Sequence, residues 1–324
     1  MDNRGFLDLI ISLLPGLLPK EKIVMINSFV HEEELYLETT AYIEEILNRK
    51  LDRCWDMLEY RNKADKIDTI CRMRSMKWVS WSSKKYPPLL REIYDPPAVI
   101  YYRGELPDPE KSMLGMVGTR KPSPEAGTQA YNIAYGVGCK GISVVSGLAL
   151  GIDSMSHRGN LASGVPGYAV LGSGIDEVYP ASNRQLAKQI LDFGGAILSE
   201  YPPGVPPSKW SFPARNRIIS GLSRSVIIVE APEKSGALIT ANFALDQGKD
   251  LWTASTGING RNMLYDRRGT MKLAEDGAEI IFSEKDVFNK WNLSIEDTGY
   301  EVSAEKDARK DIVSSMADFL KIEV

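Results

Sequence analysis

The chain has 324 residues and 43% apolar content, which allows one large α/β domain with smaller appendages. Three widely spaced cysteines and two histidines exclude a disulfide framework, a zinc pattern and a His-rich metal site, and they fit a reducing cytosol, so we expect a cytoplasmic protein with no metal and no cofactor. The net charge of −4 hides a basic middle, because residues 118–224 hold ten Lys and Arg against six Asp and Glu, whereas residues 284–324 hold six against ten.

Residues 1–80 predict a small helical domain, because apolar residues recur at helical spacing within 21–31 and 41–58. An apolar stretch at 7–18 is interrupted by charge and proline and is too short to span a bilayer, so we expect a core helix and no membrane segment. The sequence LPGLLPKEKI (14–23) predicts a tight hairpin between two helices. Such a hairpin is either a DNA-backbone contact of the helix-hairpin-helix kind or an ordinary helical turn.

Residues 81–113 are rich in proline and predict an extended lead-in that marks the domain boundary. From 114 to 283 short apolar runs alternate with segments long enough for crossover helices, which predicts a doubly wound, mostly parallel sheet. Residues 284–324 predict an acidic tail with a short helix at 312–320. The seven predicted strands are 114–118, 142–147, 167–172, 195–200, 225–230, 250–254 and 278–282.

Small and polar residues follow several of these strands, at the edge of the sheet where ligands of α/β proteins bind. Glycines let a backbone approach a ligand closely, and helix N-termini offer free N–H groups to an anion, so these exits predict phosphate binding. The dinucleotide fingerprint and the P-loop are both absent, which argues against an NAD site and a P-loop ATPase. The exits contribute Gly118, Thr119, Arg120, Ser146, Gly147, Gly151, Ser235 and Gly236.

The segment SKWSFPARNRIISGLS (208–223) combines cations with aromatic residues, as single-stranded nucleic acid requires. We expect Lys209 and Phe212, three apart in a Pro-flanked loop, to contact a phosphate and a base. The competing interpretation makes Trp210 and Phe212 core residues and pairs the arginines with carboxylates. The candidate DNA-binding residues of this segment are Lys209, Phe212, Arg215, Asn216 and Arg217.

His157 follows Asp153 by four residues, so the two would share one face of a helix. A catalytic pair is conceivable, but no serine or cysteine nucleophile stands in a recognisable setting. We therefore expect a structural hydrogen bond that holds the loop.

Six segments together resemble the DprA/Smf family of DNA-processing proteins, and they lie in order within residues 86–250, half of the chain. The motifs FPARNRIISGLS and SGLALGID are highly specific. The matching segments are VGTRKPSPEAG (117–127), SGLALGIDSMSHRGNL (146–161), AVLGSGIDEVYPASNRQL (169–186), LSEYPPG (198–204), FPARNRIISGLSRSVIIVEA (212–231) and SGALITANFALDQGK (235–249).

The resemblance implies an extended Rossmann-like domain behind a SAM-like or helix-hairpin-helix-like N-terminal domain. It also implies a homodimer that binds single-stranded DNA, protects it and helps to load RecA in natural transformation. By the family's motifs, Arg120, Lys209 and Phe212 line the DNA pocket. Residues 118, 146, 147 and 151 would form its phosphate-binding floor.

The chain departs from the family pattern near 253–280, where TASTG replaces V-P-G, and this puts the family's dimer edge in doubt. Two alternatives to a non-enzymatic DNA loader remain. One is a sensor of small nucleotides, whose pocket would look the same in sequence. The other is a nucleoside monophosphate N-glycosidase, although the P-G-G-x-G-T-x-x-E loop of such enzymes is replaced by EAPEKSGALITANFA.

Overall fold

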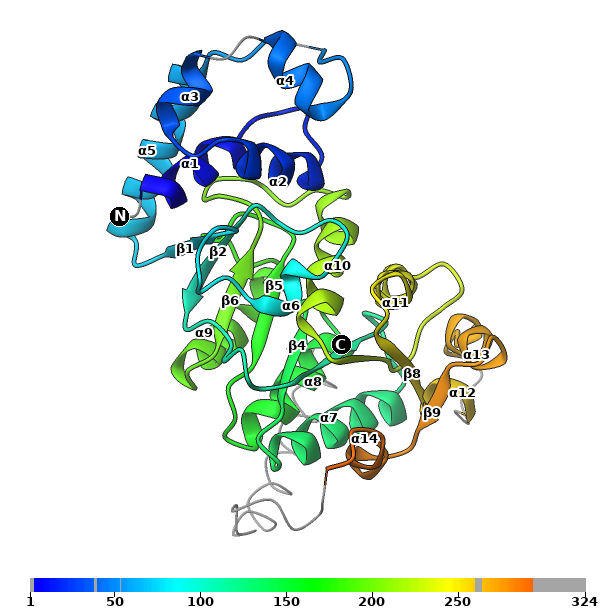
Figure 1. Cartoon of the computed structure of the whole chain (residues 1–324). Coiled ribbons are helices and arrows are strands. Elements are labelled where there is room, and N and C mark those ends of the chain that lie inside the picture. The colour runs from blue at the N-terminus through cyan, green and yellow to red at the C-terminus, as the bar shows by residue number, and fades with distance from the viewer. Residues whose placement is uncertain (1–2, 38–39, 53, 260–263, 294–324) are drawn as a thin grey trace.

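The protein is built around one nine-stranded sheet in the order β1-β2-β6-β5-β4-β3-β7-β8-β9 (Figure 1). The computed structural model describes residues 3–37, 40–52, 54–259 and 264–293. All seven predicted strands are present as β3–β9 and pair in parallel, which confirms the doubly wound architecture. The strands are β1 (Lys77–Ser80), β2 (Val99–Gly104), β3 (Met113–Val117), β4 (Ser143–Ser146), β5 (Tyr168–Leu171), β6 (Ala196–Ser199), β7 (Ser225–Ile228), β8 (Asp250–Ala254) and β9 (Glu279–Ile281).

The central strands are buried throughout because helices cover both faces of the sheet. Alternate residues of one strand enter different cores. Leu114 and Met116 pack with α7 (Pro124–Gly138) and α8 (Ile152–Ala162), whereas Met113 and Val117 pack with α10 (Ser211–Leu222) and α11 (Gly236–Asp246). Helix α9 (Arg184–Asp192) covers β5 and β6.

The chain reverses its direction of winding at β3, which lies between β4 and β7. From β3 the chain runs outward through β4, β5 and β6, and it then returns to add β7, β8 and β9 on the other side. Such a switch point opens a crevice beyond the carboxyl ends of the strands, and the crevice is where open α/β sheets bind their ligands.

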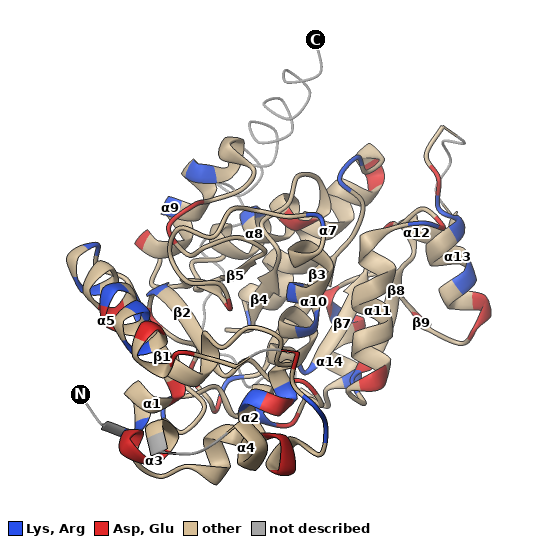
Figure 2. Ribbon diagram, turned by 90° about the horizontal axis from the view of Figure 1, so that it is seen from above, with Lys and Arg blue, Asp and Glu red and all other residues tan. Residues whose placement is uncertain are grey.

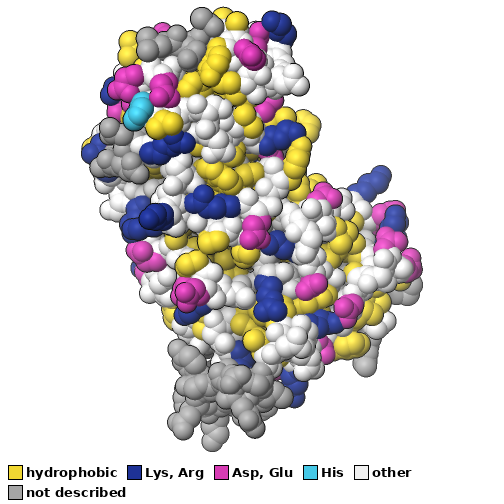
Figure 3. All heavy atoms as spheres, in the orientation of Figure 1, with side chains coloured by type: hydrophobic (Ala, Val, Ile, Leu, Met, Phe, Trp, Pro, Cys, Tyr) yellow, Lys and Arg dark blue, Asp and Glu magenta, His cyan; other side chains and the backbone are white. Residues whose placement is uncertain are grey.

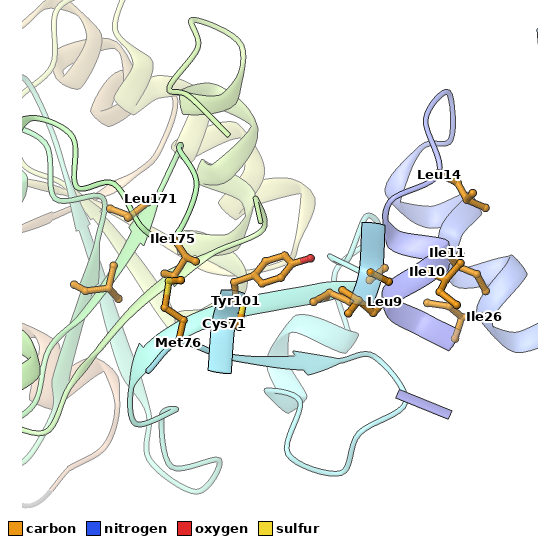
Figure 4. Close-up of a cluster of buried hydrophobic side chains, with 14 of the residues drawn as sticks. Leu9, Ile10, Ile11, Leu14, Ile26, Cys71, Met76, Tyr101, Leu171 and Ile175 are labelled. Atoms are coloured by element: carbon orange, nitrogen blue, oxygen red, sulfur yellow. The ribbon is translucent and has the colours of Figure 1, made fainter. Parts of the chain in front are cut away.

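The N-terminal helices share a core with the sheet. Leu9, Ile10 and Ile26 belong to the same buried cluster as Leu171 of β5 and Tyr101 of β2 (Figure 4). Gly16, with φ +78°, makes the expected turn between the first two helices. The helices are α1 (Asn3–Ser12), α2 (Pro19–Ser28), α3 (Glu32–Leu37), α4 (Thr40–Leu47) and α5 (Met57–Met73).

Two strands extend the sheet before the predicted start of the α/β domain. β1 lies inside the range assigned to the helical domain, and β2 lies inside the Pro-rich lead-in; both pair antiparallel, β1 with β2 and β2 with β6. The lead-in is therefore not simply extended, because it also contains the short helix α6 (Pro88–Arg91). Buried Val99, Ile100 and Tyr101 explain why β2 joins the sheet.

The segment that departs from the family pattern still completes the sheet. Helices α12 (Thr256–Asn259) and α13 (Arg268–Glu275) precede β9, which pairs in parallel with β8. Helix α14 (Glu284–Lys290), assigned from the sequence to the acidic tail, buries Val287 and Phe288 in the core beside α7. The helix predicted at 312–320 lies outside the described residues. Within them, no helix is long and apolar enough to cross a membrane.

Candidate nucleic-acid interface

A cavity of about 790 Å³ opens at the switch point, among the segments that follow β3, β4, β5 and β7 and the start of α10. Nine of the thirteen candidate residues line it, so the fold brings together side chains that are more than a hundred residues apart in the sequence. These nine are Gly118, Thr119, Arg120, Lys209, Phe212, Arg215, Asn216, Ser235 and Gly236.

Backbone hydrogen bonds fix the exit of β3. The Thr119 amide donates to the Glu230 carbonyl oxygen beyond β7 at 2.7 Å, and the Ile152 amide donates to the Thr119 carbonyl oxygen at 3.2 Å. A Cβ atom at Gly118 would lie 2.9 Å from the Glu230 carbonyl oxygen, so glycine allows the two exits to approach. The next residue, Arg120, is left with an exposed side chain at the rim.

The segment that the sequence placed in a loop begins a helix instead. Lys209 and Trp210 precede α10, and Phe212 lies in its first turn. The Ser211 hydroxyl donates to the Gly172 carbonyl oxygen after β5, which ties this turn to the sheet. Trp210 is 74% exposed, so it is not a core residue, and the Lys209 ammonium lies 4.9 Å from its ring centroid.

Two aromatic rings meet at the cavity wall. The ring centroids of Phe212 and Tyr179 lie 5.4 Å apart with a tilt of 41°. The Arg120 guanidinium lies 5.7 Å from the Phe212 centroid. Phe212 is half-buried, and a Cβ atom at Gly172 would lie 2.8 Å from its ring. The wall therefore combines flat apolar surface with a cation.

Three exposed cations surround this wall without a carboxylate to neutralise them. Among the described residues, Arg120, Lys209 and Lys234 have no Asp or Glu oxygen within 4.0 Å. Of the described residues that line this cavity, Asp153 is the one carboxylate. Elsewhere the charges are mixed, as Figure 2 shows along the ribbon and Figure 3 on one face. The crevice therefore carries an unneutralised positive charge at its rim.

Arg215 forms a buried part of the cavity floor. Its Nη1 donates to the Gly147 carbonyl oxygen at 2.6 Å and to the Val170 carbonyl oxygen, and its Nε donates to the Asn216 side-chain oxygen at 2.9 Å. Desolvation, together with repulsion from Arg120, lowers the pKa of Arg215 to about 10, although Asp153 opposes this shift. The guanidinium therefore remains charged at neutral pH.

The expected hydrogen bond between Asp153 and His157 does not form. The Asp153 carboxylate instead accepts from the Gly147 and Ala149 amides at 3.1 and 3.3 Å, and so it helps to hold the loop without His157. Burial raises the pKa of Asp153. His157 is completely buried, and neither ring nitrogen has a hydrogen-bond partner among the described residues. Desolvation, and then the nearby Arg215 charge, lower the pKa of His157 to about 3, so the ring is neutral.

Four candidate residues do not line the main cavity. The Arg217 guanidinium pairs with Glu200 at 2.7 Å and donates to the Asp95 carbonyl oxygen at 2.9 Å; burial alone would lower the pKa of Arg217, but these partners raise it. The Ser146 hydroxyl is buried and donates to the Met116 carbonyl oxygen at 2.6 Å.

Close packing explains why glycine occupies positions 147 and 151. A Cβ atom at Gly147 would lie 2.1 Å from the Arg215 Nη2 atom. Gly151 has φ +77°, and its Cβ atom would lie 2.4 Å from the Thr119 carbonyl oxygen. Of the proposed phosphate-binding floor, only Gly118 therefore reaches the main cavity.

Among the lining residues that the sequence analysis did not name as candidates, an aromatic residue and a cation could contact DNA. Tyr179 follows β5 within the family-like segment 169–186, and Lys234 immediately precedes the Ser235 cap of α11. Both lie in segments that follow predicted strands. Their positions in the sequence could therefore have identified them as site residues, whereas their residue types alone could not. Within the described part of the chain, no cluster of His, Cys, Asp and Glu suits a metal ion.

Comparisons with known proteins agree with this fold and identify the family. The model of the family described as DNA recombination-mediator protein A matches residues 77–292. DNA processing protein DprA of Bacillus subtilis is 38% identical over 235 residues, which cover 72% of this chain and 77% of that protein. Protein Smf of Borreliella burgdorferi is 32% identical over 279 residues, which cover 86% of each chain.

Solved structures give the same assignment. DNA processing protein A of Streptococcus pneumoniae superposes with a TM-score of 0.70 and 30% identity, over 90% of this chain and 98% of that one. The structure of the Helicobacter pylori protein concerns its single-stranded DNA binding mode. It superposes with a TM-score of 0.57 and 29% identity, over 67% of this chain and 96% of that one. The fold and crevice thus define a Rossmann-like protein of the DNA-processing class. The chain belongs to the DNA recombination-mediator protein A family, which includes the DprA and Smf proteins.

Proposed function

We propose that this protein binds single-stranded DNA in the crevice at the switch point and acts as a non-enzymatic loading factor. One observation carries the proposal: three exposed cations without carboxylate partners surround a wall that carries two aromatic rings. Cations track the phosphates of a strand, and rings stack on unpaired bases at about 1–3 kcal/mol per base.

A preference for single strands follows from the same arrangement. Phe212 and Tyr179 can stack only on bases that are not paired within a duplex. The Helicobacter pylori relative, studied for its single-stranded DNA binding mode, supports this proposal.

The wider role proposed is protection of incoming single strands and loading of RecA during natural transformation or recombination. The family's description as a recombination mediator supports it. Free cysteines at 54, 71 and 139 support action in the reducing cytoplasm.

A homodimer is also part of the proposal. Large exposed apolar side chains lie on three elements at the β8–β9 side of the sheet, and exposed apolar surface can take part in association. They are Leu245 on α11, Met271 on α13 and Phe282 after β9. The completed edge at β8 and β9 supports a dimer despite the divergent sequence around it. Size-exclusion chromatography with light scattering tests this.

Hydrolysis of a nucleoside monophosphate is the enzymatic alternative. The one carboxylate in the cavity lining, Asp153, is buried and already accepts two backbone hydrogen bonds, which supports a structural role. Incubation with nucleoside monophosphates, followed by chromatography for the free base, tests the alternative directly.

A binding titration separates the proposals. We expect saturable binding of an unstructured oligonucleotide, weaker binding of the blunt duplex, and weak binding of mononucleotides. Affinity should fall with salt, because each neutralised phosphate releases counterions. Equal affinity for duplex and single strand would contradict the proposal, and tight binding of a mononucleotide alone would favour a nucleotide sensor.

A further inference from the structure

A buried carboxylate holds the segment that carries Arg120. Glu230, two residues after β7, is 1% exposed and does not line the main cavity. Its backbone carbonyl oxygen accepts from the Thr119 amide at 2.7 Å. Its carboxylate accepts from the Ser123 amide at 2.9 Å and from the Ser123 hydroxyl at 2.6 Å. One residue therefore fixes both ends of the segment 119–123, and Arg120 lies between these ends.

The start of α8 confines the same segment. A Cβ atom at Gly151, the N-cap of α8, would lie 2.7 Å from the Arg120 carbonyl oxygen. The Ile152 amide donates to the Thr119 carbonyl oxygen at 3.2 Å. Pro122 is buried, and a proline disfavours helical backbone at the residue before it. The backbone at Arg120 therefore has little freedom, and these contacts set the direction in which its side chain leaves the loop.

Arg267 holds the Glu230 carboxylate in turn. Its Nε donates to Glu230 Oε2 at 3.1 Å, and its side chain is 6% exposed. Arg267 is the N-cap of α13. The Gly269 and Thr270 amides of this helix donate to the Ala231 carbonyl oxygen at 3.0 and 3.3 Å, so the start of α13 is docked on the segment that follows β7. The part of the chain that departs from the family pattern thus supplies the counter-ion of Glu230.

Geometry explains the buried pair of Glu230 and Arg267 better than stability does. Taking a carboxylate and a guanidinium out of water costs free energy, and apolar side chains of similar volume often stabilise a fold as well or better. Charge-assisted hydrogen bonds, in contrast, fix the relative positions of the groups that they join. Here they join the segment with Arg120, the start of α7 and the start of α13.

We propose that Glu230, with Arg267 as its counter-ion, is a positioning residue of the DNA interface. It holds the segment 119–123 so that the Arg120 guanidinium lies over the Phe212 ring, where it can meet a phosphate. This inference rests on the proposed function. Glu230 acts through Arg120, because its own side chain is buried outside the cavity.

The sign of the effect separates positioning from simple electrostatics. A carboxylate repels phosphates, so removing its charge would strengthen DNA binding if charge alone mattered. Removing a support for Arg120 would weaken binding instead. The two explanations therefore predict opposite changes in affinity for the same variant.

The test titrates oligo(dT) by fluorescence anisotropy at one salt concentration. We expect E230A to weaken binding about tenfold, because the Arg120 guanidinium is no longer held where a phosphate meets it. E230Q has no charge but keeps an oxygen that can accept from the Ser123 amide, so its affinity should stay within about threefold of the wild type. R120A should cost about tenfold in the wild type and less than about threefold in the E230A background.

E200A is the matched control, because Glu200 also pairs with a buried arginine, Arg217, but does not line the cavity. It should lower stability and keep the wild-type affinity. A urea unfolding curve verifies the fold of each variant. S123A removes only the hydroxyl from the support and leaves no buried charge without its partner, so it replaces E230A if that variant does not fold. It should weaken binding about threefold.

Unchanged or tighter binding by folded E230A, or an equal cost of R120A in the two backgrounds, would overturn the inference. If E230A does not fold, wild-type affinity in S123A would overturn it. Absence of saturable oligo(dT) binding by the wild-type protein would instead overturn the proposed function.

Discussion

The Arg120 guanidinium lies over the Phe212 ring, 5.7 Å from its centroid, although the two residues stand on different sides of the switch point, after β3 and at the start of α10. A phosphate contact and a stacking surface are thereby placed in direct contact. Any movement of the guanidinium toward a phosphate also changes how much of the Phe212 ring a base can reach. The two residues should therefore act together in binding.

A double-mutant cycle on these residues should show coupling. We expect R120A to weaken binding of single-stranded DNA by about 1.5–3 kcal/mol, for one charge-assisted contact, and F212A by about 1–3 kcal/mol, for one lost stack. The double variant should lose about 0.5–1 kcal/mol less than the sum, the size of an exposed cation–π contact. Anisotropy titrations provide all four affinities. Strict additivity would show that the contact has no role in binding, and unfolding curves must verify that F212A folds.

The two lysines at the rim should each contribute one phosphate contact. K209A and K234A should lower the affinity, and each should reduce the slope of log affinity against log salt by about 0.7, the value for one contact on a single strand. K285A is a suitable control, because Lys285 is exposed on α14, which packs beside α7 and does not line the cavity. A slope that K209A and K285A change equally would remove Lys209 from the interface.

The sequence predicted the parallel sheet well, because buried parallel strands are continuous apolar runs separated by crossover helices. It missed β1 and β2, which are antiparallel additions to the sheet and carry no such alternation with crossover helices. The residues that follow the predicted strands indicated the position of the crevice correctly. The sequence could not predict which of the segments that follow the strands lie close together in space. This proximity places Tyr179 against Phe212.

The position of Arg217 on the helix α10 places its side chain outside the cavity to which the sequence analysis had assigned it. Residues two apart on an α-helix point in nearly opposite directions, and the sequence analysis had placed this segment in a loop. Arg215 therefore faces the cavity, and Arg217 faces Glu200 and Asp95 on the other side of α10.

Removal of the Arg217 side chain should destabilise the fold and leave DNA binding intact. Its guanidinium is 5% exposed, and R217A would leave Glu200 without its partner, which costs about 3–5 kcal/mol in buried pairs. Urea unfolding measures this loss, and titration at a temperature where the variant is folded measures binding. A stable variant with weakened binding would return Arg217 to the interface.

His157 should make the protein less stable in acid. Its pKa is about 3 in the folded state against 6.5 for the free side chain, so between these values the unfolded chain binds the proton and the folded chain does not. The contribution of the neutral His157 ring to the free energy of unfolding is complete above pH 6.5. It falls by about 1.4 kcal/mol per pH unit as the pH drops toward 3. Asp153, whose pKa burial raises, acts in the opposite direction, because its protonation in acid favours the folded state.

The variant H157L removes the titrating ring and keeps an apolar side chain in the pocket. The free energy of unfolding, measured in urea at pH 7 and pH 5, should fall less toward acid in H157L than in the wild type, by about 2 kcal/mol over these two units. H31L is the control, because His31 is exposed on the N-terminal helical region. An acid dependence that H157L shares with the wild type would mean that His157 binds a proton in the folded protein, and the ring would then need an acceptor that the fold does not supply.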